Sequence, residues 1–341
     1  MRKRMLAVAF GPPTMAAAHA GLARIRDVAD CVELRLDLFE APFDLDTLLR
    51  ERGTLQVVAT LRSRSEGGRS PLHSDDRLRI LLRAAELGVD YVDVEWDAVT
   101  PEALAALRSA GAQVIISRHD FNLMPPGLAD EWWPQLAELG ADVVKVVGTA
   151  LDACDCLPVL RALQQASRPT IAMAMGEPGV CTRVLALRSA ECLLTYAALE
   201  DGTGTAPGQI SIRDMREVYG AQRIGSNTRV YGLLGPHLER DRLREYNAWF
   251  ASDSVDAVAV PVIASSDAAA LVSGFRALPV SGWHVHGSEL QHDLVRALDD
   301  LGPVARRQGK ANAIVRSADG ALVGHWVESP REQYELWCAE R

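Results

Sequence analysis

Short apolar runs alternate with longer amphipathic stretches along the chain up to residue 215. Eight of these runs are typical of β-strands: MLAVAF, CVELRLDLF, LQVVATLR, YVDVEWD, QVIISRHDF, DVVKVVGTA, TIAMAMG and CLLTYAAL. Between them lie segments such as DRLRILLRAAELG and PEALAALRSAG, whose apolar spacing is nearly helical and which end in glycine. This α/β alternation predicts eight βα units that close into a (β/α)8 TIM barrel.

An open, doubly wound sheet is the main alternative. It would need fewer strands, and the glycine fingerprint of a dinucleotide-binding turn is missing after the first strand. The helical segment SIRDMREVYG is expected to finish the barrel, which we assign to residues 1–220. The polar stretch AQRIGSNTR is expected to be a linker.

A second pattern of strands and helices follows the linker. The runs VYGLLG, VDAVAVPVIA, GWHVHG and NAIVRS are typical of strands, and SSDAAALVSGFRAL is typical of a helix. We therefore predict a small α/β domain over residues 229–341.

Composition narrows the functional class. The 341 residues are 48% hydrophobic and 24% charged, as in soluble globular proteins. A net charge of -9 argues against a nucleic-acid or anionic-membrane partner, which would favour a basic surface. The basic start MRKR precedes a short apolar run that GPP interrupts, and no apolar segment approaches the ~20 residues needed to cross a bilayer. We expect a cytoplasmic protein that acts on a small molecule.

The cysteines and histidines do not predict a metal site. Six cysteines are scattered without a CxxC pair, so neither a disulfide framework nor a zinc site is indicated. His284, His286 and His292 lie close together in the second domain, but no carboxylate pattern accompanies them.

Polar residues fall where the strands of such a barrel end, which is where barrel enzymes place their active sites. The residues are Glu33, Arg35, Arg62, Glu66, His119, Lys145, Arg183, Thr205 and Gln209. Each has an ordinary explanation by itself: Lys145 could snorkel to solvent, His119 could be structural, and Glu33 and Arg35 could form an ion pair. Their convergence on one rim favours a catalytic site.

Lys145 suggests the chemistry. An amine inside a β-branched run is poorly hydrated, and it can attack a ketone to give a protonated Schiff base that withdraws electrons. The carbon beside the iminium becomes acidic, so His119 could remove its proton and return one to a leaving hydroxyl. Arginines would bind a carboxylate and Glu33 would hold hydroxyl groups. The expected substrate is a small polyhydroxylated keto acid.

Six segments in order carry a specific resemblance: ELRLDLF, RSRSEGG, IISRHDF, ADVVKVVGTA, MAMGEPGVCTR and APGQIS. They resemble type I 3-dehydroquinate dehydratase, a Schiff-base lyase of the shikimate pathway. The resemblance implies that Lys145 forms an imine with the ketone of 3-dehydroquinate. It also implies that His119 acts as base and acid in the elimination to 3-dehydroshikimate, with no cofactor and no metal.

The same resemblance implies roles for the remaining residues. Arg183 and Gln209 would hold the substrate carboxylate and a nearby hydroxyl, and Glu66 would pair with His119. The residues implied to line the pocket around the ring hydroxyls are Glu33, Arg35 and Arg62. Thr205 stands where the family usually has serine, which keeps a hydroxyl on a loop expected to close over the substrate.

From residue 230 the chain is similar to the substrate-binding lobe of shikimate dehydrogenase, which is fused behind this dehydratase in plant enzymes. The similarity lies in VYGLLG, YNAWF, VDAVAVPV and NAIVR. The serine-rich shikimate-binding turn is replaced by PHLERDRLRE, Leu290 aligns with the catalytic lysine, and Glu328 aligns with its aspartate partner. The region is also too short for a nicotinamide-binding lobe. We expect a non-catalytic domain that stabilises a homodimer, binds a regulatory metabolite or is a relic.

Two other functions remain open. An aldolase acting on a sugar phosphate would also use a lysine imine, although no phosphate-binding glycine loop follows the seventh strand. A non-catalytic metabolite sensor would not need both Lys145 and His119. The biological context of the dehydration, in aromatic biosynthesis, quinate breakdown or a secondary pathway, is also open.

Overall fold

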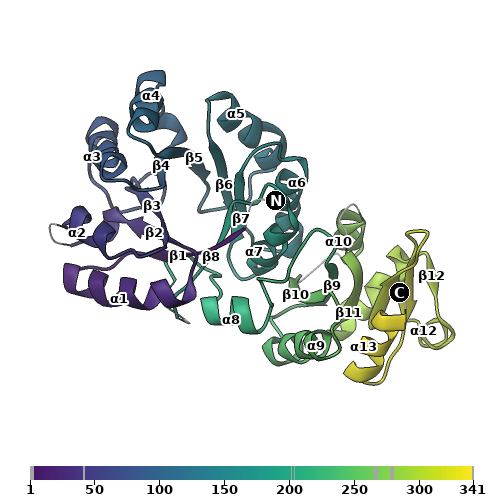
Figure 1. Ribbon diagram of the computed structural model, residues 1–341. Coiled ribbons are helices and arrows are strands. Elements are labelled where there is room, and N and C mark those ends of the chain that lie inside the picture. The colour runs from purple at the N-terminus through teal and green to yellow at the C-terminus, as the bar shows by residue number, and fades with distance from the viewer. Residues whose placement is uncertain are drawn as a thin grey trace.

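The computed structural model describes residues 4–40, 43–200, 202, 204–264, 268–276 and 280–339. Two sheets organise these residues, one of eight strands and one of six. Figure 1 shows them as two neighbouring bodies, with helices around the outside of the larger one. The predicted barrel followed by a small α/β domain is confirmed.

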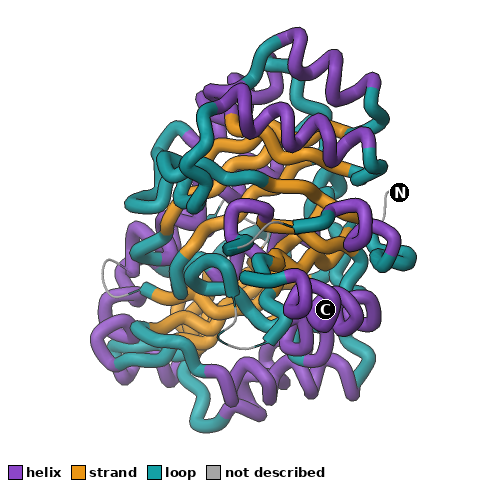
Figure 2. Tube along the Cα trace, turned by 90° about the vertical axis from the view of Figure 1, so that its left-hand side faces the viewer, coloured by secondary structure: helices purple, strands orange, loops and turns teal. Residues whose placement is uncertain are grey.

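The first body consists of alternating strands and helices. Its strands are β1 (Met5–Phe10), β2 (Cys31–Arg35), β3 (Gln56–Thr60), β4 (Tyr91–Glu95), β5 (Gln113–His119), β6 (Val143–Thr149), β7 (Thr170–Met175) and β8 (Leu194–Ala197). Its helices are α1 (Met15–Val28), α2 (Leu45–Arg50), α3 (Ser74–Glu86), α4 (Pro101–Ser109), α5 (Trp133–Glu138), α6 (Leu157–Gln165), α7 (Val180–Leu185) and α8 (Ile212–Glu217). All paired strands are parallel, in the order β7-β6-β5-β4-β3-β2-β1-β8. Figure 2 shows these strands enclosed by helices.

The barrel is nearly closed. β7 and β8 share no continuous ladder and meet at an isolated parallel bridge between Thr170 and Cys192. Two backbone hydrogen bonds flank this bridge, from Leu193 N to the Thr170 oxygen (3.0 Å) and from Thr170 N to the Glu191 oxygen (2.8 Å). The seam is therefore joined at the N-terminal ends of these strands and is open toward the end where a barrel site lies.

Strand alternation separates two cores. Side chains of a strand point alternately to opposite faces, so residues two apart share one face. Val143 and Val147 belong to an inner apolar cluster, whereas Val144 and Val146 belong to the core under the helices. Lys145 lies between the two inner valines, which directs its side chain into the barrel.

The second body is a mixed sheet in the order β10-β9-β11-β13-β14-β12. Its strands are β9 (Arg229–Gly235), β10 (Ala257–Ile263), β11 (Val280–Val285), β12 (Asp300–Leu301), β13 (Ala313–Arg316) and β14 (Leu322–His325). Its helices are α9 (Arg240–Ser252), α10 (Ala268–Phe275), α11 (Ser288–Asp293), α12 (Pro303–Gln308) and α13 (Pro330–Ala339). The sequence analysis did not predict β12 and β14, because β12 has only two residues and β14 (LVGH) has only two apolar residues before a glycine.

The two bodies are in contact. α7 of the barrel packs against β10, and Arg244 of α9 lies 3.2 Å from the carboxylate of Asp214 in α8. The connection is not a loose linker, because Ala221 and Ile224 are buried and the Ile224 carbonyl accepts a hydrogen bond from Arg4. No helix among the described residues combines the length and apolar character needed to span a membrane.

Candidate active site

Lys145 lies at the centre of a buried acidic group inside the barrel. Its Nζ is 2.8 Å from Asp93 Oδ2, 3.1 Å from Glu33 Oε1 and 3.4 Å from the Tyr196 hydroxyl. The lysine side chain is only 5% exposed, so it does not snorkel to solvent. A buried ammonium requires such partners, and the same carboxylates would stabilise a positively charged imine at this position.

Asp93 was not among the predicted site residues, although it contacts two of them. Burial alone would raise its pKa, but the charges of Arg62 and Lys145 hold the pKa of this carboxyl well below its usual range. Arg62 donates to Asp93 Oδ2 at 2.8 Å and to the Ser117 hydroxyl at 2.7 Å. Asp93 is therefore a permanent negative charge between two cations.

His119 and Glu66 form the expected pair. His119 Nδ1 is 2.7 Å from Glu66 Oε2, and the His119 backbone N–H donates to the same oxygen at 3.1 Å. Burial, with the nearby charges of Arg62 and Lys145, lowers the pKa of His119 well below its usual value. Burial raises the pKa of Glu66 to about 7. The imidazole is therefore neutral near pH 7, as a general base must be.

Arg183 is a buried cation of a different kind. It lies in the short helix α7, which follows β7. It donates to the Gly208 oxygen at 3.0 Å and the Pro207 oxygen at 3.4 Å, and among the described residues no carboxylate pairs with it. Burial lowers the pKa of Arg183 to about 10. Such a guanidinium is suited to a substrate carboxylate.

Arg35 is already paired. Its guanidinium makes two hydrogen bonds to Asp37, at 2.9 and 2.8 Å, in bidentate geometry. The Asp37 carboxylate also accepts backbone N–H bonds from Arg62 and Arg69. Arg35 is thus held in a fixed orientation at the rim.

Thr205 and Gln209 lie on the loop between β8 and α8. The Thr205 backbone N–H donates to Gln209 Oε1 at 2.9 Å, so the glutamine side chain closes a turn within the loop. Gly176 N donates to the Pro207 oxygen, which docks the loop on the end of β7. The loop therefore covers the open part of the seam.

All nine sequence-predicted residues line one cavity. The other lining residues are Ala9, Gly67, Phe121, Val147, Met173, Met175, Tyr196 and Ala206. The sequence analysis missed Asp93 and Tyr196. Asp93 could have been found from strand parity, because Tyr91, Asp93 and Glu95 alternate with valines just as Glu33 and Arg35 alternate with leucines. Tyr196 carried no comparable signal, since aromatic residues are common in barrel cores.

Comparisons with known proteins agree with this geometry. The sequence profile of the type I 3-dehydroquinase family matches residues 6–226. The bifunctional 3-dehydroquinate dehydratase/shikimate dehydrogenase of Arabidopsis thaliana is 30% identical over 307 residues, covering 87% of this chain. The chain spans half the length of that relative.

Solved structures are similar as well. The 3-dehydroquinate dehydratase of Geobacillus kaustophilus has 27% sequence identity and a TM-score of 0.57, over 62% of this chain and 88% of its own. The dehydroquinate dehydratase and shikimate dehydrogenase part of the AroM protein from S. pombe covers 95% of this chain and 65% of its own, with a TM-score of 0.54 and 24% identity. The latter likeness shows that the two bodies share its fold. The chain belongs to the type I 3-dehydroquinase family.

Proposed function

We propose that this chain removes water from 3-dehydroquinate through a Schiff base on Lys145, giving 3-dehydroshikimate. The observation that carries the proposal is the buried amine of Lys145, set between two carboxylates. The same cavity contains a neutral imidazole and an arginine that no carboxylate of the described residues pairs with. The family of the chain supports the same reaction.

The first step is substrate binding. Arg183 would bind the carboxylate of 3-dehydroquinate, because its guanidinium faces the cavity and makes only carbonyl and sulfur contacts among the described residues. Gln209 lies beside it on the loop and would hold the adjacent hydroxyl. Arg35, Arg62 and Glu33 would contact the ring hydroxyls.

The second step is imine formation. The Lys145 ammonium first passes one proton to a neighbouring base, and the free amine then attacks the ketone carbon. The carbinolamine takes that proton back as its hydroxyl leaves as water, which gives a protonated iminium. The positive nitrogen then occupies the position of Nζ, where Asp93 and Glu33 stabilise it electrostatically. No cofactor is needed, because the iminium is the electron sink.

The third step is elimination. When Glu66 accepts a hydrogen bond from Nδ1, the Nε2 of His119 can take the proton from the carbon next to the iminium, forming an enamine. The enamine expels the β-hydroxyl, which leaves as water with the proton carried by His119. Addition of a second water to the conjugated iminium releases 3-dehydroshikimate and the free lysine. Overall, one substrate gives one product and one water.

Borohydride trapping tests the proposal. Reduction of the enzyme mixed with 3-dehydroquinate should add one ligand mass to the chain, and the substrate without borohydride should develop the absorbance of a conjugated enone. Lys145→Met should lose both signals, whereas Lys310→Met, which changes a partly buried lysine over the Trp326 ring in the second domain, should keep both. A sensor would give neither signal in the wild-type chain, and an aldolase would give an adduct without the enone. Either result would overturn the dehydratase.

We also propose that residues 1–220 form the catalytic domain and that residues 229–341 have no dehydrogenase activity. Leu290, which aligns with the catalytic lysine of shikimate dehydrogenase, is a buried apolar residue. Glu328 at the aspartate position is bonded to Trp326 Nε1. The full chain should not reduce NADP with shikimate, while an authentic shikimate dehydrogenase in the same assay should. Measurable turnover by the full chain would refute this assignment.

We propose that the reaction takes place in the cytoplasm and without a nucleic-acid partner. Cys31, Cys156, Cys181 and Cys192 are buried free thiols, as expected in a reducing compartment, and the net charge of -9 disfavours binding to nucleic acid. Fractionation of cells that express the tagged chain would test the compartment. Sedimentation would test the homodimer.

A further inference from the structure

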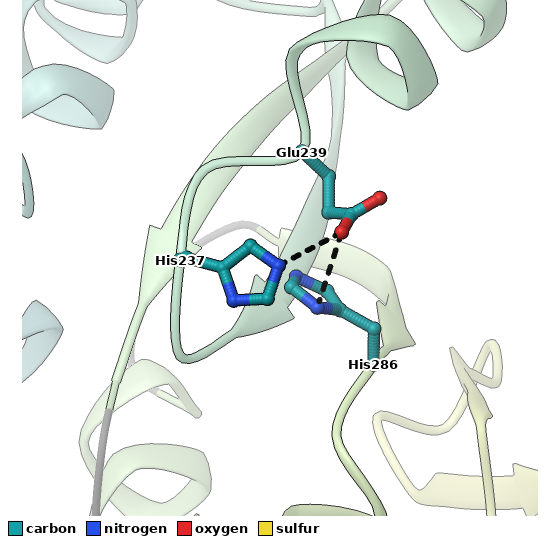
Figure 3. Close-up of side chains that lie close together, drawn as sticks. All are labelled: His237, Glu239 and His286. Carbon is teal, nitrogen blue, oxygen red and sulfur yellow. Dashed lines mark hydrogen bonds and ion pairs between the residues drawn. The ribbon is translucent and has the colours of Figure 1, made fainter.

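Two histidines and a glutamate meet at one edge of the second sheet. His237 and Glu239 lie on the turn between β9 and α9, and His286 directly follows β11 (Figure 3). His237 Nε2 is 3.0 Å from Glu239 Oε1, and His286 Nδ1 is 3.9 Å from the same oxygen. The ligand atoms of all three residues lie within 4.8 Å of one another.

The backbone supports this arrangement. β9 and β11 are adjacent parallel strands, so their C-terminal ends bring residues that are about 50 positions apart to the same edge. The His286 ring lies over Gly235, where a Cβ would approach to 2.0 Å from the ring. Only glycine at the end of β9 leaves room for this imidazole. The two imidazole rings meet edge to face, with centroids 5.1 Å apart.

The sequence analysis predicted no metal site, because it grouped His286 with His284 and His292 and found no carboxylate. Neither of those histidines belongs to this cluster. His284 Nδ1 bonds the Tyr246 hydroxyl and His292 bonds the Gly309 oxygen. The carboxylate comes instead from Glu239, which lies 47 positions before His286 along the chain.

We propose that His237, Glu239 and His286 bind a divalent first-row transition metal ion, with zinc as the representative ion. Two imidazoles and one carboxylate are a common ligand set for such ions, and bond lengths of about 2.0–2.2 Å place tetrahedral ligand atoms about 3.3–3.6 Å apart. The distances of 3.0 and 3.9 Å bracket that value. The bound ion retains open positions for water or for an anionic ligand.

The ordinary alternative is a hydrogen bond between His237 and Glu239 with no ligand. That pair does not account for His286, whose ring is mostly buried and whose Nδ1 faces Glu239 Oε1 at 3.9 Å, beyond hydrogen-bond distance. A metal ion bound to both residues would join the β9–α9 turn to the end of β11. Without an ion, Glu239 and His286 approach each other only to 3.9 Å. The bound ion would therefore stabilise the second domain.

The test uses the full chain without an affinity tag, stripped of metal by a chelator and then dialysed. Calorimetric titration with Zn²⁺ should show one site, and Co²⁺ should give visible absorption of a tetrahedral or five-coordinate complex. His237→Ala and Glu239→Gln should each weaken the Zn²⁺ affinity at least tenfold and reduce the rise of the melting temperature with Zn²⁺. His292→Ala, which removes a histidine of the same domain outside the cluster, should bind like the wild type.

His237 is largely exposed, so its replacement should not disturb folding, and the circular dichroism spectrum checks this for each variant. The proposal fails if the metal-free wild-type chain binds Zn²⁺ no more tightly than free histidine does. It also fails if His237→Ala and Glu239→Gln retain the wild-type affinity. Neither readout depends on dehydratase activity, so the outcome is independent of the proposed function.

Discussion

Two buried cations in the barrel differ in how their charge is balanced. Lys145 lies between Asp93 and Glu33, whereas Arg183 contacts carbonyl oxygens and the Met173 sulfur, with no carboxylate among the described residues. A buried cation without a counterion costs folding free energy. The buried position of Arg183 is explained if a carboxylate of the substrate is its counterion.

Arg183→Gln should therefore weaken substrate binding without weakening the fold. Loss of a charge-assisted hydrogen bond worth about 1.5–3 kcal/mol should raise KM roughly 10-fold to 100-fold. The melting temperature should stay the same or rise, because the buried charge is gone. Steady-state kinetics and a thermal melt check this, with Arg161→Gln, which breaks an exposed ion pair to Asp130, as the control. An unchanged KM would contradict the assignment of Arg183.

The pH dependence of turnover follows from His119. Its pKa is lowered by burial, so the imidazole stays neutral at pH values where an exposed histidine would be protonated. Because the neutral form is the base, activity should persist as pH falls below 6.5 and be lost only at the lowered pKa. The acid limb of kcat/KM, measured between pH 4.5 and 8 in constant ionic strength, should lie below pH 6.5. A limb near pH 7 would instead report protonation of Glu66, whose pKa is raised to about 7, and would contradict control of the acid limb by His119.

At the scale of elements, the β8–α8 loop is the least regular part of the site and depends on glycine. Gly208 has a φ of +73°, and a Cβ there would lie 2.2 Å from the Gly176 oxygen. Gly202 in the same connection has a φ of +76°, but a Cβ there would meet no atom of the described residues within 4 Å. Both glycines therefore adopt a positive φ that favours glycine, but only Gly208 is also closely packed against a neighbouring segment.

Gly208→Ala should displace the loop from the end of β7, and with it the carbonyl groups that hold Arg183. We expect a KM increase of about tenfold or more and a stability loss of about 1–3 kcal/mol, from backbone strain and the close contact together. Gly202→Ala should show only the strain, with KM unchanged. Kinetics and urea denaturation of both variants provide the comparison. Equal effects of the two substitutions would argue against docking of the loop.

At the scale of the whole molecule, the second domain is joined to the barrel by packing as well as by the chain. α7, which contains Arg183, packs against β10. A cavity at the boundary is lined by Gln209 from the barrel and by Leu238 and Arg240 from the second domain. The pair of exposed Arg244 and partly buried Asp214 adds little, because solvent around Arg244 screens it.

A chain cut after residue 226 should therefore keep turnover and lose stability. All nine proposed site residues precede the cut, but the surface of α7 that packs on β10 becomes exposed to water. We expect kcat similar to that of the full chain and a melting temperature several degrees lower. The enone assay and calorimetry measure both quantities. Loss of turnover in a truncated chain that still melts cooperatively would show that the second domain takes part in catalysis.

The strands and the site residues were predictable for the same reason. A buried parallel strand needs a run of apolar residues, and a polar residue inside such a run stands out, as Lys145 does in DVVKVVGTA. Asp93 and Tyr196 were missed because their contacts with Lys145 come from β4 and β8, which are not the immediate neighbours of β6 in the barrel. The incomplete closure between β7 and β8 also left no local signal.

The sequence by itself determined the βα alternation, the family and the residues that carry the proposed chemistry, because periodicity and motif order are local properties of the chain. Only the tertiary structure decided which charges meet. It set Asp93 and Glu33 against Lys145, left Arg183 without a carboxylate among the described residues, and brought His286 to Glu239 across adjacent strands. The physical reason is that pairing depends on distances in space, which strand order and register set between residues that are far apart in the chain.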